Sequence, residues 1–185
     1  MSYAKDVFLV MAEQCQKAGV PFVLVGGFAV NFHHVTRNTT DVDFLMLEED
    51  FTKLTPFLAE AGYSQVMKQH LYARVRKENE PSGIFLDIDI LFTDPQSFRT
   101  LLGEASDWDL DGMKIKVVSL NHLIAMKLHS LKNNPTGRED PDFSDLVKLV
   151  CLNQIDVLSD RFRALCLKFG NQEIYDKIAK RVTHG

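Results

Sequence analysis

Two pairs of aspartates are the residues of this sequence best suited to chemistry. Asp41 and Asp43 alternate with apolar residues, and so do Asp87 and Asp89. Side chains two apart in a strand point to the same face, so each pair would place both carboxylates on one face. Like charges so close together repel, and a hard divalent cation with oxygen ligands compensates them. The pattern predicts a site for Mg²⁺ or Mn²⁺.

The second pair lies in a run, residues 84–92, that is apolar almost throughout and is expected to form a central, buried strand. Burying an unpaired carboxylate costs roughly several kcal/mol, so at least one of the pair should face the same site as Asp41 and Asp43. Asp89 is favoured as this third carboxylate, because the residues after it indicate a strand that is leaving the core. Asp87 is the alternative.

A glycine pair supplies the other half of the site. The apolar run 21–25 predicts a buried strand, and Gly26 and Gly27 end it. Two glycines allow a tight turn in which backbone N–H groups approach a ligand that any Cβ would push away. Residues 28–34 read as a short helix, so the turn would lie at a helix N-terminus, which favours phosphate. We expect Gly26 and Gly27 to bind the phosphates of a nucleotide.

The remaining elements follow from periodicity and from glycine and proline positions. We predict helices at 3–17, 48–61, 119–132, 143–152, 159–169 and 172–182, strands at 63–67 and 71–76, two short strands around Asp111-Gly112, and a mobile loop at 133–141. Strands mixed with helices, followed by helices only, indicate an α/β fold. Its core would be a central mixed β-sheet flanked by helices (residues 1–140), with a C-terminal helical bundle (residues 141–185) packed on it.

Composition limits the classes of function. The 185 residues are 45% hydrophobic, enough for a full core, and the net charge of −4 gives no overall basic surface for nucleic acid. A local patch of Arg74, Arg76 and Lys77 is one candidate for such binding, and a solvated strand is the alternative. Three cysteines without metal spacing, no signal layout and no apolar run near ~18 residues predict a cytoplasmic protein that does not span a membrane.

The order Gly-Gly, Asp-hydrophobic-Asp and a later Asp on a central strand resembles the nucleotidyltransferase fold of the DNA polymerase β type. The chain is most similar to the minimal bacterial branch that includes AbiEii-type toxins. The segments that carry this resemblance are residues 24–30, Arg37, Thr40, residues 41–44, 119–128 and 142–146. Two positions depart from the family: Phe28 follows the glycines where many members have Gly-Ser, and Pro141 replaces the lysine of a Lys-Asp-x-x-Asp stretch.

The resemblance implies transfer of a nucleoside monophosphate from a nucleoside triphosphate (NTP) to a hydroxyl of RNA, a protein or a small molecule. It also implies a toxin whose partner is an antitoxin. Asp41 and Asp43 would hold one or two Mg²⁺ ions, and Asp89 would bind the ion nearer the attacking hydroxyl and help to deprotonate it. Two other interpretations are a catalytically inactive nucleotide-binding protein of the same fold and a partner-binding module whose acidic strands only bind cations.

Five further polar residues are candidates for the same site. Arg37 would contact a phosphate or pair with a carboxylate, and Lys127 would supply a cation near the nucleotide or lie on the solvated surface. Asp142 and Asp145 lie three residues apart on one helix face and would orient Lys127 or the substrate, although Asp142 could simply cap its helix. Thr40 is the fifth candidate.

Overall fold

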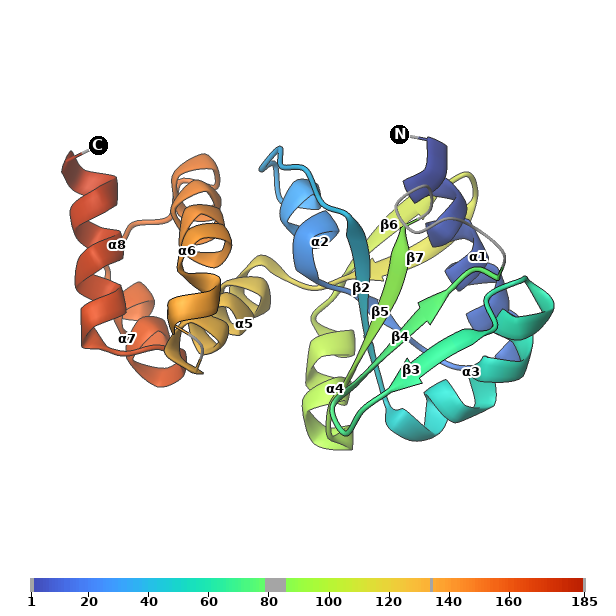
Figure 1. Cartoon of the computed structure of the whole chain (residues 1–185). Helices are drawn as coiled ribbons and strands as arrows, with labels where there is room; N and C mark the ends of the chain where they lie inside the picture. Colours follow the sequence, from blue (N-terminus) through green and yellow to red (C-terminus); the bar gives the residue numbers. More distant parts are fainter. Residues whose placement is uncertain (1, 79–85, 134, 185) are drawn as a thin grey trace. The chain divides into compact units, whose positions relative to one another are not determined.

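The computed structural model describes residues 2–78, 86–133 and 135–184, with no account of the side chains of residues 2–5, 135–140 and 184. The chain forms two compact units (Figure 1). The first, here called the sheet unit, comprises residues 1–29 and 38–119, and the second, the helical unit, comprises residues 30–37 and 120–185. The division falls at residues 119 and 120, whereas the boundary predicted at residues 140 and 141 lies inside a helix.

The sheet unit contains a seven-stranded mixed sheet with the strand order β3-β4-β5-β2-β1-β7-β6. The strands are β1 (Val23–Leu24), β2 (Asp41–Met46), β3 (Gln65–Lys68), β4 (Tyr72–Arg76), β5 (Asp87–Phe92), β6 (Ser106–Leu110) and β7 (Met113–Val117). Pairing is parallel between β2 and β5 and between β1 and β7, and antiparallel elsewhere. The expected central strands β2 and β5 lie side by side, and part of the predicted strand at residues 84–92, residues 84 and 85, lies outside the described residues.

Two helices cover the apolar face of this sheet. Phe8 of α1 (Ser2–Ala18) packs edge-to-face on Phe44 and Trp108, at centroid distances of 6.3 and 5.4 Å. Phe51 of α3 (Glu48–Glu60) packs on Phe92 of β5 at 5.5 Å. Aromatic contacts of this kind contribute through both apolar burial and ring geometry. Trp108 is therefore a packing residue, as expected.

The helical unit is built from α5 (Leu120–Asn133), α6 (Pro135–Leu152), α7 (Asp160–Phe169) and α8 (Gln172–His184). Its core consists of apolar side chains from all four helices, among them Leu123, Leu128, Leu146, Phe162 and Ile178. Ser159 caps α7 by accepting a hydrogen bond from the Phe162 backbone N–H at 3.3 Å. The α/β class with a mixed sheet and C-terminal helices is thus confirmed.

Three local predictions differ from the structure. Residues 135–141 are helical, not a loop: Pro135 is the first residue of α6, where its missing N–H costs no hydrogen bond, and Pro141 lies inside the helix. Helix α4 (Pro95–Gly103) was not predicted, although Asp94 caps it and Pro95 begins it. Helix α2 (Gly26–Phe32) begins at Gly26 instead of at residue 28.

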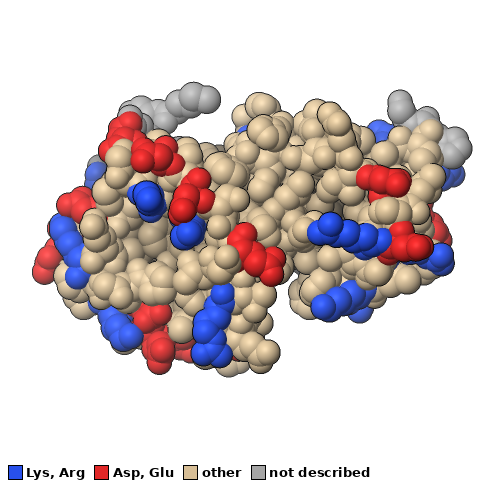
Figure 2. All heavy atoms as spheres, turned by 180° about the vertical axis from the view of Figure 1, so that it is seen from behind, with Lys and Arg blue, Asp and Glu red and all other residues tan. Residues whose placement is uncertain are grey.

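The surface charges and the cysteines are arranged as the sequence predicts, with no disulfide pairing of the three cysteines. Figure 2 shows acidic and basic side chains interspersed on the face turned away from the view of Figure 1. Cys15 and Cys166 are buried, and burial raises the pKa of each thiol to about 12, whereas Cys151 is exposed. All three cysteines are free. In the part of the chain that the structure describes, no helix has both the length and the apolar character to cross a membrane.

Candidate active site

The four aspartates of the sequence motif lie on one face of the sheet. β2 and β5 run parallel and in register, so that Asp41 is opposite Asp87 and Asp43 is opposite Asp89. The alternating residues Val42, Phe44, Ile88 and Ile90 are completely buried on the other face. Burial of the apolar positions therefore fixes the aspartates on the opposite side, because the side-chain period of a strand is two.

Gly26 lies directly against Asp43. Its φ of +64° is a left-handed conformation that side chains rarely adopt, and a Cβ at this position would overlap the Asp43 carboxylate. The backbone N–H of Val25 donates to the carbonyl oxygen of Asp43 at 2.9 Å, which holds the two segments together. Glycine is thus needed at residue 26 both for the backbone angle and for the close approach of a site carboxylate.

Two arginines of the neighbouring strand β4 pair with the aspartates of β5. Arg74 donates from Nε and Nη2 to the two carboxylate oxygens of Asp89, both at 2.6 Å. Arg76 donates from Nε and Nη2 to Oδ2 of Asp87 at 2.9 and 2.8 Å. The sequence predicts a nucleic-acid patch or a solvated strand for these arginines, whereas in the structure they form ion pairs with Asp89 and Asp87. Their period-two spacing, which matches that of the aspartates, was the available signal.

Arg74 and Arg76 are the positive charges that pair with the aspartates of β5 on this face. Hydrogen bonding to Asp89 raises the pKa of Arg74 well above its usual value, with a further contribution from the charges of Asp89, Asp87 and Asp41. Asp89 is 8% exposed, so its bidentate partner lies in a partly desolvated setting where such pairs are strong. Within residues 2–78, 86–133 and 135–184, no three acidic, histidine or cysteine side chains are arranged to hold a metal ion.

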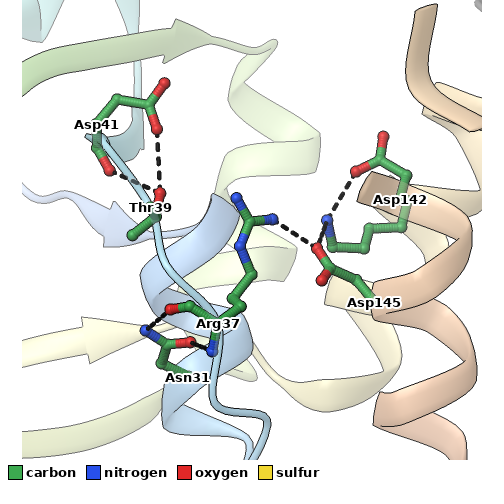
Figure 3. Close-up of polar contacts among 7 residues, drawn as sticks. Asn31, Arg37, Thr39, Asp41, Asp142 and Asp145 are labelled. Carbon is green, nitrogen blue, oxygen red and sulfur yellow. Dashed lines mark hydrogen bonds and ion pairs between the residues drawn. The ribbon is translucent and has the colours of Figure 1, made fainter. Parts of the chain in front are cut away.

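Carboxylate oxygens are nevertheless the ligands that Mg²⁺ and Mn²⁺ favour, and the face offers them on adjacent strands. Asp41 accepts a hydrogen bond from the Thr39 hydroxyl at 3.1 Å, which orients the carboxylate (Figure 3). This role of Thr39 is not predicted from the sequence. Thr40, the predicted candidate, is exposed. The donor set fits a divalent cation at Asp41 and Asp43, and Asp89, which lies opposite Asp43, is bound by Arg74.

Four other candidates form a network within the helical unit. The Nζ atom of Lys127 lies 2.8 Å from Oδ1 of Asp142 and 2.7 Å from Oδ2 of Asp145, and Nη1 of Arg37 lies 2.7 Å from the same Asp145 oxygen (Figure 3). Asn31 fixes the Arg37 backbone through hydrogen bonds of 3.0 and 3.1 Å. Lys127, Asp142 and Asp145 are all buried.

This network corrects two of the alternatives. Lys127 is not a solvated surface lysine, because only 8% of its side chain is exposed. Asp142 does not cap its helix, because α6 begins seven residues earlier at Pro135. Arg37 forms the ion pair that was one of its two expected roles, and the aspartates orient Lys127. The three ion pairs hold residues 30–37 and helices α5 and α6 together by charge pairing.

The family model for the nucleotidyl transferase AbiEii toxin of type IV toxin–antitoxin systems matches residues 9–181. The chain belongs to this family. The match covers nearly the whole chain, so it includes both the carboxylate face of the sheet unit and the buried network of the helical unit. A search of curated proteins gave no significant match.

Solved structures confirm the fold of this AbiEii-family chain. An antigenic nucleotidyltransferase-like protein from Paracoccidioides brasiliensis is 17% identical with a TM-score of 0.60, covering 100% of this chain and 98% of that one. ANT(2")-Ia in complex with adenylyl-2"-tobramycin is 16% identical with a TM-score of 0.65, covering 90% and 96%. The lincosamide antibiotic adenylyltransferase LnuA, with lincomycin bound, is 15% identical with a TM-score of 0.54, covering 80% and 96%.

The position of Gly26 predicts a large loss of stability in Gly26→Ala. The left-handed φ costs about 1–2 kcal/mol for an L-residue, and forcing a Cβ against Asp43 adds about 1–3 kcal/mol. Gly19→Ala is the matched control, because Gly19 has a φ of +66° and nothing within 4 Å of an added Cβ. Urea denaturation should show a clearly larger loss of unfolding free energy for Gly26→Ala. Equal losses would mean that the contact with Asp43 imposes no constraint.

The buried network predicts that Lys127→Met destabilises the protein by about 3–5 kcal/mol, because it removes the cation that Asp142 and Asp145 share. Lys132→Met is the control, since Lys132 is exposed on the same helix and its replacement should change stability by no more than about 0.5 kcal/mol. Chemical denaturation measures both variants. A Lys127 variant as stable as the control would show that the network does not hold the helical unit together.

Proposed function

We propose that the protein is a metal-dependent nucleotidyltransferase that moves a nucleoside monophosphate from an NTP to a hydroxyl group of an acceptor. The observation that carries the proposal is the face formed by Asp41, Asp43, Asp87 and Asp89, with Gly26 seated against Asp43, in a chain of the AbiEii family. A glycine whose missing Cβ makes room for a carboxylate favours a binding site over a merely solvated strand.

The metal would be held by Asp41 and Asp43, with Asp89 as the third ligand. Both residues of the first pair are partly exposed, so a cation can reach them from solvent. When bound, Mg²⁺ or Mn²⁺ would neutralise phosphate charge and favour departure of pyrophosphate. Asp87 pairs with Arg76 at the more exposed end of the pair of strands, which supports Asp89 as the third carboxylate.

The reaction is an attack of the acceptor oxygen on the α-phosphorus of the NTP. A new P–O bond forms, the bond to the β-phosphate oxygen breaks, and pyrophosphate leaves. Asp89, released from Arg74, would accept the proton of the attacking hydroxyl. The Gly26-Gly27 backbone would lie beside the β and γ phosphates, because glycine at residue 26 lets the chain pass close to Asp43, a proposed metal ligand. Such a site works mainly by positioning its reactants and by compensating charge.

The two candidate cations of the helical unit receive different roles. A quarter of the Arg37 side chain is exposed, so we assign to Arg37 a contact with a phosphate in addition to its ion pair with Asp145. Lys127 is enclosed by two carboxylates and we assign to it the positioning of α6, not nucleotide binding.

We further propose that the protein acts as the toxin of a toxin–antitoxin pair, with an antitoxin as its partner. This rests on the family, whose description names a toxin of type IV systems. RNA, proteins and small molecules are the three acceptor classes to compare. Incubating the protein with each labelled NTP, Mg²⁺ and each acceptor class separately would identify the one that becomes labelled.

Asp43→Asn should lower label transfer by roughly 100-fold or more, the scale for losing one group that stabilises transition-state charge, while the fold persists. Asp107→Asn, which removes an exposed strand carboxylate paired with Lys116, is the matched control and should retain full transfer. Label transfer and growth of a bacterial host after induction are the two measurements. Full activity of the Asp43 variant contradicts the proposal. Nucleotide binding without pyrophosphate release by the unaltered protein would instead indicate a catalytically inactive relative.

A further inference from the structure

The carboxylate face continues across two more strands as two rows of side chains. Strand register gives one row as Met67, Arg74, Asp89 and Asp43. Register and the Arg76–Asp87 ion pair give the other as Gln65, Arg76, Asp87 and Asp41. Each row therefore runs from a neutral residue on β3, through an arginine on β4, to two aspartates on β5 and β2. Beside the arginines lies a hollow of about 290 Å³, lined by Gln65, Val66, Met67, Arg74 and Arg76.

Arg74 occupies both oxygens of Asp89. Its Nε and Nη2 atoms lie 2.6 Å from Oδ1 and Oδ2, and its Nη1 atom lies 3.7 Å from Oδ2 of Asp87. A divalent cation would need the same Asp89 oxygens, because carboxylate oxygens are the atoms it binds. Arg74 and a metal ion therefore compete for one carboxylate.

The charges on these side chains determine how strongly Arg74 and a metal ion compete for Asp89. Among these six side chains the four aspartates carry four negative charges and the two arginines two positive ones, so the face favours a further cation. Asp89 can offer the cation the lone pairs that Arg74 now holds only if Arg74 withdraws from them. Arg74 is able to withdraw, because 31% of its side chain is exposed and the hollow beside it opens next to its long, flexible stem.

We propose that Arg74 is a displaceable counter-ion that holds the third carboxylate, Asp89, in place until a metal ion binds and then moves away from it. The inference rests on the proposed function, since it requires a metal at Asp41 and Asp43. Arg74 is a positioning residue in this scheme: it fixes the orientation of the Asp89 carboxylate while no cation is present, and it makes metal binding weaker than the carboxylates alone would.

Mn²⁺ binding to the full chain, followed by electron paramagnetic resonance of the free ion, tests the proposal without any activity measurement. Arg74→Gln should bind Mn²⁺ about tenfold more tightly than the unaltered protein, equivalent to about 1.4 kcal/mol. Arg74→Lys keeps the charge but loses the bidentate geometry, and its affinity should lie between the two. Circular dichroism establishes that each variant is folded, and Arg74→Lys carries the test if Arg74→Gln does not fold.

Two controls separate competition for Asp89 from a general effect of charge. Lys68→Gln removes a positive charge from β3 that pairs with Glu48, and it should change Mn²⁺ affinity by less than about twofold, as expected for an exposed pair. In an Asp89→Asn background, adding Arg74→Gln should also change affinity by less than about twofold, because contacting residues reveal their coupling in such cycles. A tenfold gain in that background, or an unchanged affinity of Arg74→Gln alone, would overturn the proposal.

Asp43→Asn distinguishes failure of this inference from failure of the proposed function. If Asp43→Asn loses Mn²⁺ binding while Arg74→Gln equals the unaltered protein, the metal site stands and only the role of Arg74 is wrong. If Asp43→Asn binds Mn²⁺ as well as the unaltered protein, the ion lies elsewhere and both are wrong. Absence of binding by both the unaltered protein and Arg74→Gln would also overturn both.

Discussion

Repulsion among four aspartates on one face of two adjacent strands is the constraint on which the sheet unit depends. The apolar residues that alternate with them are buried under α1 and α3, so the aspartates cannot turn to the other face without exposing that core. The charges must be compensated where they are. Arg74 and Arg76 do so for Asp89 and Asp87 from the neighbouring strand, at 2.6 to 2.9 Å, and the proposed divalent cation would do so at Asp41 and Asp43.

The helical unit also compensates neighbouring aspartates, but there the carboxylates and one of the cations are buried. Asp142 and Asp145 are buried within α6, and Lys127 and Arg37 neutralise them through ion pairs of 2.7 to 2.8 Å. In the sheet unit the arginine side chains are partly exposed, whereas Lys127 is enclosed. This difference in burial is the reason for assigning an exchangeable role to Arg74 and a structural one to Lys127.

Sequence predicted the parts of this arrangement that depend on local periodicity. Alternation around Asp41 and Asp43 fixed their common face, and the unbroken apolar character around Asp89 indicated a central strand. The period-two spacing of Arg74 and Arg76 indicates that they share a face, but which of them meets Asp89 depends on the register between β4 and β5, which local sequence does not determine. The match to the family model covers residues 9–181, so it includes every candidate site residue predicted from the sequence.

The errors have local causes. Asp94 followed by Pro95 is a helix start signal, and it could have predicted helix α4 from the sequence. The segment before Asp142 is polar and contains two prolines, and this composition predicts a loop. It is helical because Pro135 fits a first helical turn, and because Asp142 and Asp145 both reach Lys127 when they lie on one helical face. Tertiary ion pairs thus overrode a weak local preference.

The central claim is that the carboxylate face is the metal site of a nucleotidyltransferase. A crystal structure with Mn²⁺ and a non-hydrolysable NTP analogue, recorded with anomalous scattering, tests it most directly. We expect an anomalous peak for manganese about 2.1 Å from carboxylate oxygens of Asp41 and Asp43. The triphosphate should lie beside Gly26 and Gly27. Nucleotide bound with manganese at other residues, and none on this face, would contradict it.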